Sequence, residues 1–216
     1  MTDLFEDEFL AATAALVHEQ HHKAHVQATR RASRRATRRA ASTAALAEVF
    51  PQQLEPGTSW HFISQGDIDS LSYLTLLLDR ALLDYLLFST WCMALDDVAQ
   101  IERWLLEGRI GRVDAYCGEI FPSQYPDEHV LLAEVLHAHG GRLAVFRNHS
   151  KIMAGYDAAG QGYVLESSAN INTNPRAEQT ALHIDTSLAD FYRGFFDGIR
   201  SFERDFDHVQ PWSPQQ

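Results

Sequence analysis

Cysteine is scarce in this chain, and the two that occur, Cys92 and Cys117, lie in apolar stretches without a CxxC or Cys/His spacing. A disulfide framework and a cysteine-based zinc site are therefore not expected, and both thiols are predicted to be buried. A secretory signal is also missing, because the N-terminal stretch MTDLFEDEFL is acidic and has no basic segment before an apolar run. These absences lead us to expect a cytoplasmic protein.

Long uninterrupted hydrophobic runs are lacking as well. The longest apolar stretch, Leu71 to Leu95, contains Asp79, Arg80 and Asp84. Three charges are costly inside a bilayer, so this stretch is interpreted as core elements, and no membrane partner is expected. The 216 residues, of which 45% are hydrophobic and 22% charged, suffice for one domain of ordinary size with an appendage.

Glycine and proline are absent from residues 1–49, which are rich in alanine, arginine, glutamate and glutamine. This composition predicts a helical arm over residues 1–49 and a linker over 50–59, followed by one domain over 60–216. Carboxylates are absent from residues 20–40, although the whole chain has a net charge of −11. The arginines of the arm recur at helical spacing and would form one stripe: Arg30, Arg31, Arg34, Arg35, Arg38 and Arg39.

A stripe of arginines without carboxylates is typical of a segment that meets a polyanion, so we expect it to bind the phosphate backbone of nucleic acid. Aromatic residues are absent from the stripe, and binding should therefore not depend on sequence. The alternative is a solvated helix or a dimer contact with the acidic remainder of the chain. Four histidines before the stripe share one helical face, which is either a plain polar face or a site for Zn²⁺ or Ni²⁺: His18, His21, His22 and His25.

From residue 60 onward, short apolar runs alternate with amphipathic segments. We expect strands near 61–64, 82–91, 112–117 and 142–146, a hairpin over 151–166, and helices over 68–80, 96–107, 128–139 and 188–206. Asp96 is expected to cap the second of these helices and Gly108 to end it. The alternation predicts an α/β fold with a mixed, mostly parallel sheet flanked by helices.

Polar residues suited to phosphate chemistry lie around the predicted hairpin. His149 and Lys151 come between two expected strands, and Ser168 and Asn170 follow the hairpin. Residues i and i+2 of a strand face the same side, so each pair can project into one pocket. An imidazole can attack phosphorus near neutral pH, while ammonium, hydroxyl and amide groups donate to phosphoryl oxygens. Taken singly, each residue would also fit an ordinary polar loop.

This order of His-x-Lys, Ser-x-Asn and a carboxylate at Glu178 resembles the phospholipase D superfamily over roughly residues 60–200. The resemblance implies a phosphohistidine intermediate on His149, with Lys151, Ser168 and Asn170 holding the phosphoryl oxygens. It also implies that Glu178 supports the histidine and that neither a metal nor a cofactor takes part. Members of the superfamily build their site from two such motifs, so a chain with one motif is expected to form a homodimer.

Two positions depart from the family pattern. Asp157 stands one residue further from Lys151 than the aspartate of the family usually does, so it is either a site residue or an ordinary turn residue. Ser167 stands where the family has glycine. The favoured function is a metal-independent phosphodiesterase, most simply a nonspecific endonuclease. The alternatives are a catalytically silent nucleic-acid-binding or assembly protein with this fold, and a phospholipid hydrolase.

Overall fold

The computed structural model describes residues 38–171, 176–202 and 209–213. The chain divides into two compact units, residues 1–41 and 42–216. Most of the arm predicted from the sequence lies outside the described residues, including the histidine face and the arginines Arg30, Arg31, Arg34 and Arg35. Arg38 and Arg39 lie in a helix that the structure describes over residues 38–47.

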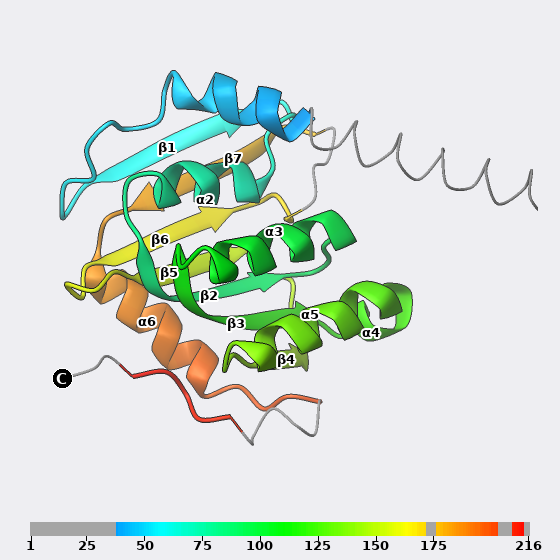
Figure 1. Ribbon diagram of the computed structural model, residues 1–216. Helices are drawn as coiled ribbons and strands as arrows, with labels where there is room; N and C mark the ends of the chain where they lie inside the picture. Colours follow the sequence, from blue (N-terminus) through cyan, green and yellow to red (C-terminus); the bar gives the residue numbers. More distant parts are fainter. Residues whose placement is uncertain (1–37, 172–175, 203–208, 214–216) are drawn as a thin grey trace, which may run out of the picture. The chain divides into compact units, whose positions relative to one another are not determined.

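The second unit is built on one seven-stranded sheet with helices on both faces (Figure 1). Its strands are β1 (Ser59–Ser64), β2 (Leu83–Thr90), β3 (Ile110–Gly118), β4 (Leu143–Phe146), β5 (Ile152–Tyr156), β6 (Gly162–Ser167) and β7 (Glu178–His183). Its helices are α2 (Ser70–Leu78), α3 (Leu95–Leu106), α4 (Phe121–Gln124), α5 (Pro126–Ala138) and α6 (Thr186–Asp197). Residues of α2, α3 and α5 pack on one face of the sheet and residues of α6 on the other.

The strand order is β1-β7-β6-β5-β2-β3-β4. β2, β3 and β4 are parallel neighbours, and they form the predicted βαβ units. The remaining neighbours are antiparallel. The mixed α/β fold is therefore confirmed, but the prediction of a mostly parallel sheet needs correction, since antiparallel pairs outnumber parallel ones among the described strands. The reason is that the chain returns between β5, β6 and β7 without the crossover helix that parallel pairing needs.

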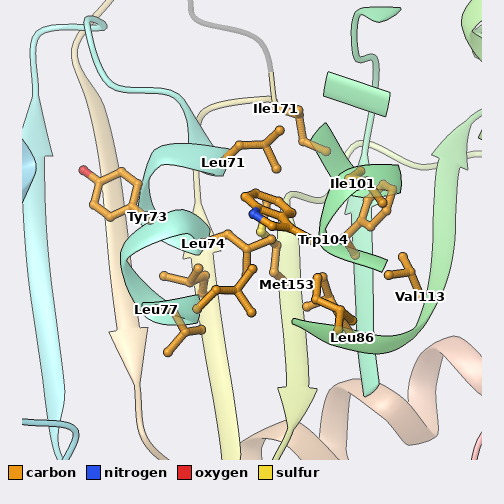
Figure 2. Packing of buried hydrophobic residues seen from close by; sticks show 14 of the residues in the cluster. Leu71, Tyr73, Leu74, Leu77, Leu86, Ile101, Trp104, Val113, Met153 and Ile171 are labelled. Carbon is orange, nitrogen blue, oxygen red and sulfur yellow. The ribbon is translucent and has the colours of Figure 1, made fainter. Parts of the chain in front are cut away.

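The interior strand β2 is buried on both faces, which explains the apolar run in its sequence. Leu86 and Phe88 face the larger core, in which Trp104 of α3 is only 1% exposed (Figure 2). Tyr85 and Leu87 face the smaller core under α6. Burying a large apolar side chain stabilises the fold by about 1.5–3 kcal/mol. The two cores thereby fix the carboxyl end of β2, where the candidate site lies.

The segment before β1 also packs on the larger core. Leu46 and Phe50 are each 2% exposed and belong to the cluster of buried residues. The Ser42 hydroxyl donates a hydrogen bond to the carbonyl oxygen of Asp67. Residues 42–50 therefore contact the domain directly, and a truncation that tests the arm has to end before them.

α3 begins one residue earlier than the sequence indicates. Asp97, and not Asp96, stabilises its first turn, because the Asp97 carboxylate accepts a hydrogen bond from the N–H of Ala94 at 2.8 Å. A carboxylate that faces the free N–H groups of a helix start is favourable there. Gly108 follows the helix as predicted, with a φ of +67° that favours glycine.

Two features at the C-terminal end differ from the prediction. The sequence analysis does not predict β7. In this strand Thr180 and Leu182, two residues apart, are buried in the core. α6 begins earlier than predicted because the Asp185 carboxylate caps it, accepting from the N–H of Leu188 at 3.1 Å. The helix ends at Asp197 and not at Phe206, since Gly198 follows it and glycine disfavours helix continuation.

A buried polar network ties β3 to the start of β4. The Asp114 side chain is completely buried and accepts from the backbone N–H of Arg142 at 3.0 Å. It also accepts from the Tyr85 hydroxyl at 2.9 Å and from the Arg112 Nε at 3.0 Å. Removing one partner of such a buried ion pair commonly costs about 3–5 kcal/mol. The network therefore fixes the strand whose other end leads into the candidate site.

Candidate active site

The residues expected to carry chemistry lie at one edge of the sheet. The carboxyl ends of β2, β3, β4 and β6 meet there with the amino ends of β5 and β7, and the β2 and β6 arrows point to that side in Figure 1. His149 lies in the loop between β4 and β5, and Lys151 directly precedes β5. Loops at the carboxyl ends of parallel strands are a common place for binding sites in α/β proteins.

His149 and Lys151 contact each other. The Lys151 Nζ lies 3.0 Å from the His149 Nδ1 and 3.4 Å from the Nε2, and it donates to the His149 carbonyl oxygen at 2.6 Å. A charged ammonium can only donate, so a ring nitrogen that faces it holds a lone pair. The imidazole is exposed to solvent. In this contact the lone pair accepts from the ammonium, so it becomes free to attack a phosphate once the ammonium turns to the phosphoryl oxygens.

The loop that carries this pair is held by Asn148, which sequence reasoning missed. The Asn148 amide is buried and donates to the carbonyl oxygens of Tyr116 at 2.9 Å and Thr90 at 3.4 Å, at the ends of β3 and β2. Its Oδ1 accepts from both the backbone N–H and the hydroxyl of Ser150. The Ser150 hydroxyl in turn contacts the Ser89 hydroxyl at 2.8 Å. Each neighbour of His149 is therefore fixed to the sheet.

Ser168 and Glu178 contact each other in the next part of the candidate site. The Ser168 hydroxyl donates to the Glu178 Oε2, and it accepts from the backbone N–H of Gln179 at 3.0 Å. The Ser167 N–H donates to the Lys151 carbonyl oxygen at 3.0 Å, so β6 brings this serine loop beside the lysine. Within the described residues, no hydrogen bond joins Glu178 to the His149 ring. The predicted support of the histidine by Glu178 therefore stays a prediction.

Burial lowers the pKa of the Lys151 ammonium below its ordinary value, because a half-buried cation loses hydration. The Cys92 thiol and the Glu178 carboxylate act in the opposite direction and raise this pKa. Lys151 is thus a cation that is partly withdrawn from water, which strengthens its interaction with an anionic ligand.

Asn170 lies at the amino end of α2. The Ser70 hydroxyl donates to the carbonyl oxygens of Ala169 at 3.1 Å and Asn170 at 3.2 Å. The Asn170 Oδ1 is buried and has no hydrogen-bond partner among the described residues. A buried amide oxygen without a partner is costly, so this side chain is suited to rearrange when a ligand binds.

A cavity of about 10 Å³, enough for one water molecule, lies under the lysine. Its polar lining consists of the lysine and five hydroxyl-bearing side chains, from Ser70, Tyr73, Ser89, Ser167 and Thr180. Ser167, which replaces the glycine of the family pattern, donates to the Gln179 carbonyl oxygen at 3.2 Å and contacts the Thr180 hydroxyl at 2.9 Å. Its side chain therefore joins β6 to β7 below the site.

Asp157 lies at the far end of β5 from Lys151. Its carboxylate accepts from the N–H groups of Ala159 and Gln161, each at 2.9 Å, and from the Tyr163 hydroxyl at 2.9 Å. Five strand residues separate it from Lys151, a length of roughly 17 Å. The structure thus favours the turn-residue interpretation of Asp157 over the catalytic one.

The described residues also bear on membranes and metals. None of the helices within them is long and apolar enough to cross a bilayer. The same part of the chain contains no group of three or more His, Cys, Asp or Glu side chains placed to hold a metal ion. The histidine face of the arm lies outside it.

Comparison with known proteins gives similarity in fold only. No protein-family model and no curated protein sequence matches the chain. A polyphosphate kinase from Porphyromonas gingivalis is similar at 16% identity and a TM-score of 0.49, over 73% of this chain and 27% of the kinase. Nuc, a phospholipase D family member from Salmonella typhimurium, is similar at 14% identity and a TM-score of 0.49, over 70% of this chain and 95% of Nuc. The archaeal chromatin protein TrmBL2 is similar at 11% identity and a TM-score of 0.47, over 95% of this chain and 69% of TrmBL2.

The chain spans about a quarter of the kinase but nearly all of Nuc. Among these proteins, Nuc is described as a member of the phospholipase D family, which the motif spacing of this chain resembles. Because these TM-scores lie below 0.5, we base the function on the geometry of this chain's own residues.

Proposed function

We propose that this protein is a metal-independent phosphodiesterase with His149 as its nucleophile. The observation that carries the proposal is the contact of the exposed His149 ring with the half-buried ammonium of Lys151. The Ser167 N–H donates to the Lys151 carbonyl oxygen, so this pair lies beside the start of the loop that carries Ser168 and Asn170, and the Ser168 hydroxyl donates to the Glu178 carboxylate. One nucleophile, one cation and two neutral donors are sufficient to bind and attack a phosphate diester.

The proposed reaction has two steps. The lone pair of His149 attacks phosphorus, the bond from phosphorus to the leaving oxygen breaks, and that oxygen takes a proton from a second histidine. Water then attacks the phosphohistidine, the second histidine takes the proton of that water, and a phosphate monoester leaves while His149 is regenerated. Lys151 and Asn170 stabilise the negative charge on the phosphoryl oxygens in both steps, and Ser168 joins them when its hydroxyl turns from Glu178 to the phosphate.

The second histidine is proposed to be His149 of a second copy of the chain. A chain with one His-x-Lys and Ser-x-Asn set supplies one nucleophile, so a two-fold homodimer would bring two such histidines together. Sedimentation at several protein concentrations tests the dimer directly. A species that stays monomeric while turning over substrate would contradict this part of the proposal.

Nucleic acid is the proposed substrate, and nonspecific endonuclease cleavage the proposed activity. The support is the arginine stripe of the arm, which fits a phosphate backbone better than it fits a lipid bilayer. Plasmid, single-stranded DNA, RNA and phospholipid vesicles, each incubated in EDTA, separate these substrates. A cytoplasmic location stays a prediction from the sequence.

The decisive experiment compares His149→Ala with His137→Ala, a control at an exposed histidine of α5. Loss of a covalent nucleophile commonly lowers kcat by several powers of ten, so His149→Ala should abolish turnover while folding and nucleic-acid binding persist. Brief incubation of the wild type with labelled substrate should also trap an acid-labile phosphohistidine. Turnover of His149→Ala within about tenfold of wild type would reject the mechanism. Binding without turnover by the wild type would favour a catalytically silent protein.

A further inference from the structure

Trp91 stands beside the nucleophile and has no part in the sequence-based interpretation of the site. It directly follows β2 and is half-buried. Its ring centroid lies 5.8 Å from that of His149, with 57° between the ring planes. The indole therefore lies beside the imidazole and lines this side of the site.

The position of Trp91 is fixed by Gly118 at the end of β3. A Cβ atom at residue 118 would lie 2.6 Å from the Trp91 Cδ1 and 3.0 Å from the Asn148 carbonyl oxygen. Both distances are shorter than normal contacts, so the indole can lie against this backbone only because residue 118 is glycine. The end of β3, Gly118 and the Trp91 indole thus pack against one another and form one surface of the site.

The Trp91 indole N–H has no hydrogen-bond partner in the part of the chain that the structure describes. An indole N–H that is turned into a protein core usually finds a partner. The half-buried Trp91 leaves part of its ring system in reach of a ligand, in contrast to Trp104, which is 1% exposed.

We propose that Trp91 stacks on the base of the nucleotide that carries the scissile phosphate, an inference that rests on the proposed phosphodiesterase function. The Trp91 and His149 rings lie 5.8 Å apart. A phosphate bound to His149 would therefore place one of its substituents close to the indole. A flat aromatic face accepts any base, which fits cleavage without sequence preference.

A quaternary ammonium headgroup also binds aromatic faces, but here it would meet a like charge. The Lys151 Nζ lies 3.0 Å from the Nδ1 of His149, the residue whose ring neighbours the Trp91 indole. Repulsion from this cation favours a neutral base over a cationic lipid headgroup at Trp91.

The test uses three p-nitrophenyl diesters with the same leaving group: thymidine 5′-(p-nitrophenyl phosphate), methyl p-nitrophenyl phosphate and p-nitrophenylphosphorylcholine. Each is assayed with the wild type, Trp91→Phe, Trp91→Leu and the control Trp60→Phe, which changes another partly exposed tryptophan in β1. Stacking of one base commonly changes affinity by roughly ten- to a hundredfold. We expect Trp91→Leu to lose about this factor in kcat/KM on the thymidine ester and less than about threefold on the methyl ester. Trp91→Phe should keep most of the preference for the thymidine ester over the methyl ester, and Trp60→Phe should keep all of this preference.

An equal loss on the thymidine and methyl esters would overturn the inference, because the ring would then act only through His149. A loss confined to the choline ester would overturn it in favour of a headgroup site. If the wild type turns over none of the esters, the proposed function fails, and binding of thymidine 5′-monophosphate decides the inference separately. Quenching of indole fluorescence that disappears in Trp91→Phe would uphold base stacking, and thymidine 5′-monophosphate binding no tighter than inorganic phosphate would overturn it.

Discussion

The Oδ1 of Asn148 accepts two hydrogen bonds from Ser150, one from the backbone N–H at 2.9 Å and one from the hydroxyl at 2.6 Å. Because His149 lies between these two residues, the side chain of Asn148 clamps the backbone on both sides of the proposed nucleophile. The amide nitrogen of the same side chain reaches the ends of β2 and β3. The position of the histidine is thereby coupled to the core of the sheet.

Asn148→Ala should lower both stability and turnover. It leaves the buried Tyr116 carbonyl and the Ser150 N–H without these partners, and an unsatisfied buried group costs about 1–3 kcal/mol. Urea unfolding should show a loss in this range, with kcat reduced more than KM is raised. Ser150→Ala, which removes one hydroxyl and keeps the backbone bond, serves as the milder control. Unchanged unfolding and unchanged kcat in Asn148→Ala would show that the clamp is not needed.

The sequence predicts that His149 and Lys151 share a pocket, but the reason it gives is incomplete. Alternation along a strand does not bring them together, because His149 lies in a loop before β5. They meet because the flexible lysine side chain folds back over the carbonyl oxygen of His149. Local spacing thus indicates the pair, and the loop conformation produces the contact.

Other parts of the site depend on contacts distant in sequence and leave little local signal. Asn148 resembles a loop asparagine, and its burial follows from β2 and β3, which lie 58 and 32 residues earlier at Thr90 and Tyr116. β7 is short and partly polar, so a strand there is hard to distinguish from a loop by composition. Its pairing with β6 is what places Glu178 near Ser168. The mixed α/β fold can be predicted from the sequence because the segments that form β2 and α3 have strong hydrophobic patterns.

The lowered pKa of Lys151 predicts an alkaline limit to substrate binding. As pH rises through this pKa the ammonium loses its proton, so affinity for a phosphodiester should fall at a lower pH than for an exposed lysine. Glu178→Gln removes an interaction that raises the pKa, and the limit should move to still lower pH. Lys151→Arg should move the alkaline limit of substrate binding beyond the measurable pH range, because arginine stays charged. KM measured between roughly pH 7 and 11 checks this order, with circular dichroism as the control for unfolding. A shift of the Glu178→Gln limit to higher pH would contradict the assignment.

Turnover should survive excess EDTA. The charge stabilisation proposed for the reaction comes from Lys151, Ser168 and Asn170, which need no metal ion to act. A Mg²⁺-dependent nuclease assayed in the same buffer shows that chelation is complete. Activity that disappears on chelation and returns with Zn²⁺ or Mg²⁺ would point to another site. Replacing His18, His21, His22 and His25 together by glutamine would then show whether the histidine face of the arm is responsible.

The last prediction separates the arm from the chemistry. A chain lacking residues 1–37 loses four arginines of the stripe and Lys23 but keeps Leu46 and Phe50, whose burial the domain needs. If the arm contacts phosphates, each contact contributes about 0.9 to the slope of log affinity against log salt on duplex DNA, so the slope should fall by several units. Turnover of methyl p-nitrophenyl phosphate, which is too small to reach the arm, should hardly change.

A matched control for this truncation is the full-length chain in which Arg30, Arg31, Arg34 and Arg35 are all replaced by glutamine. It removes the charge but not the segment, so it should reproduce the loss of salt dependence if the contacts are electrostatic. Sedimentation of both variants tests whether the dimer persists. The rival view, in which the arm docks on the acidic domain or builds the dimer, predicts an unchanged salt slope in both variants. It also predicts that the truncated chain dissociates and loses small-substrate turnover, because the two copies of His149 would separate. That combination would reject the assignment of the arm to nucleic acid.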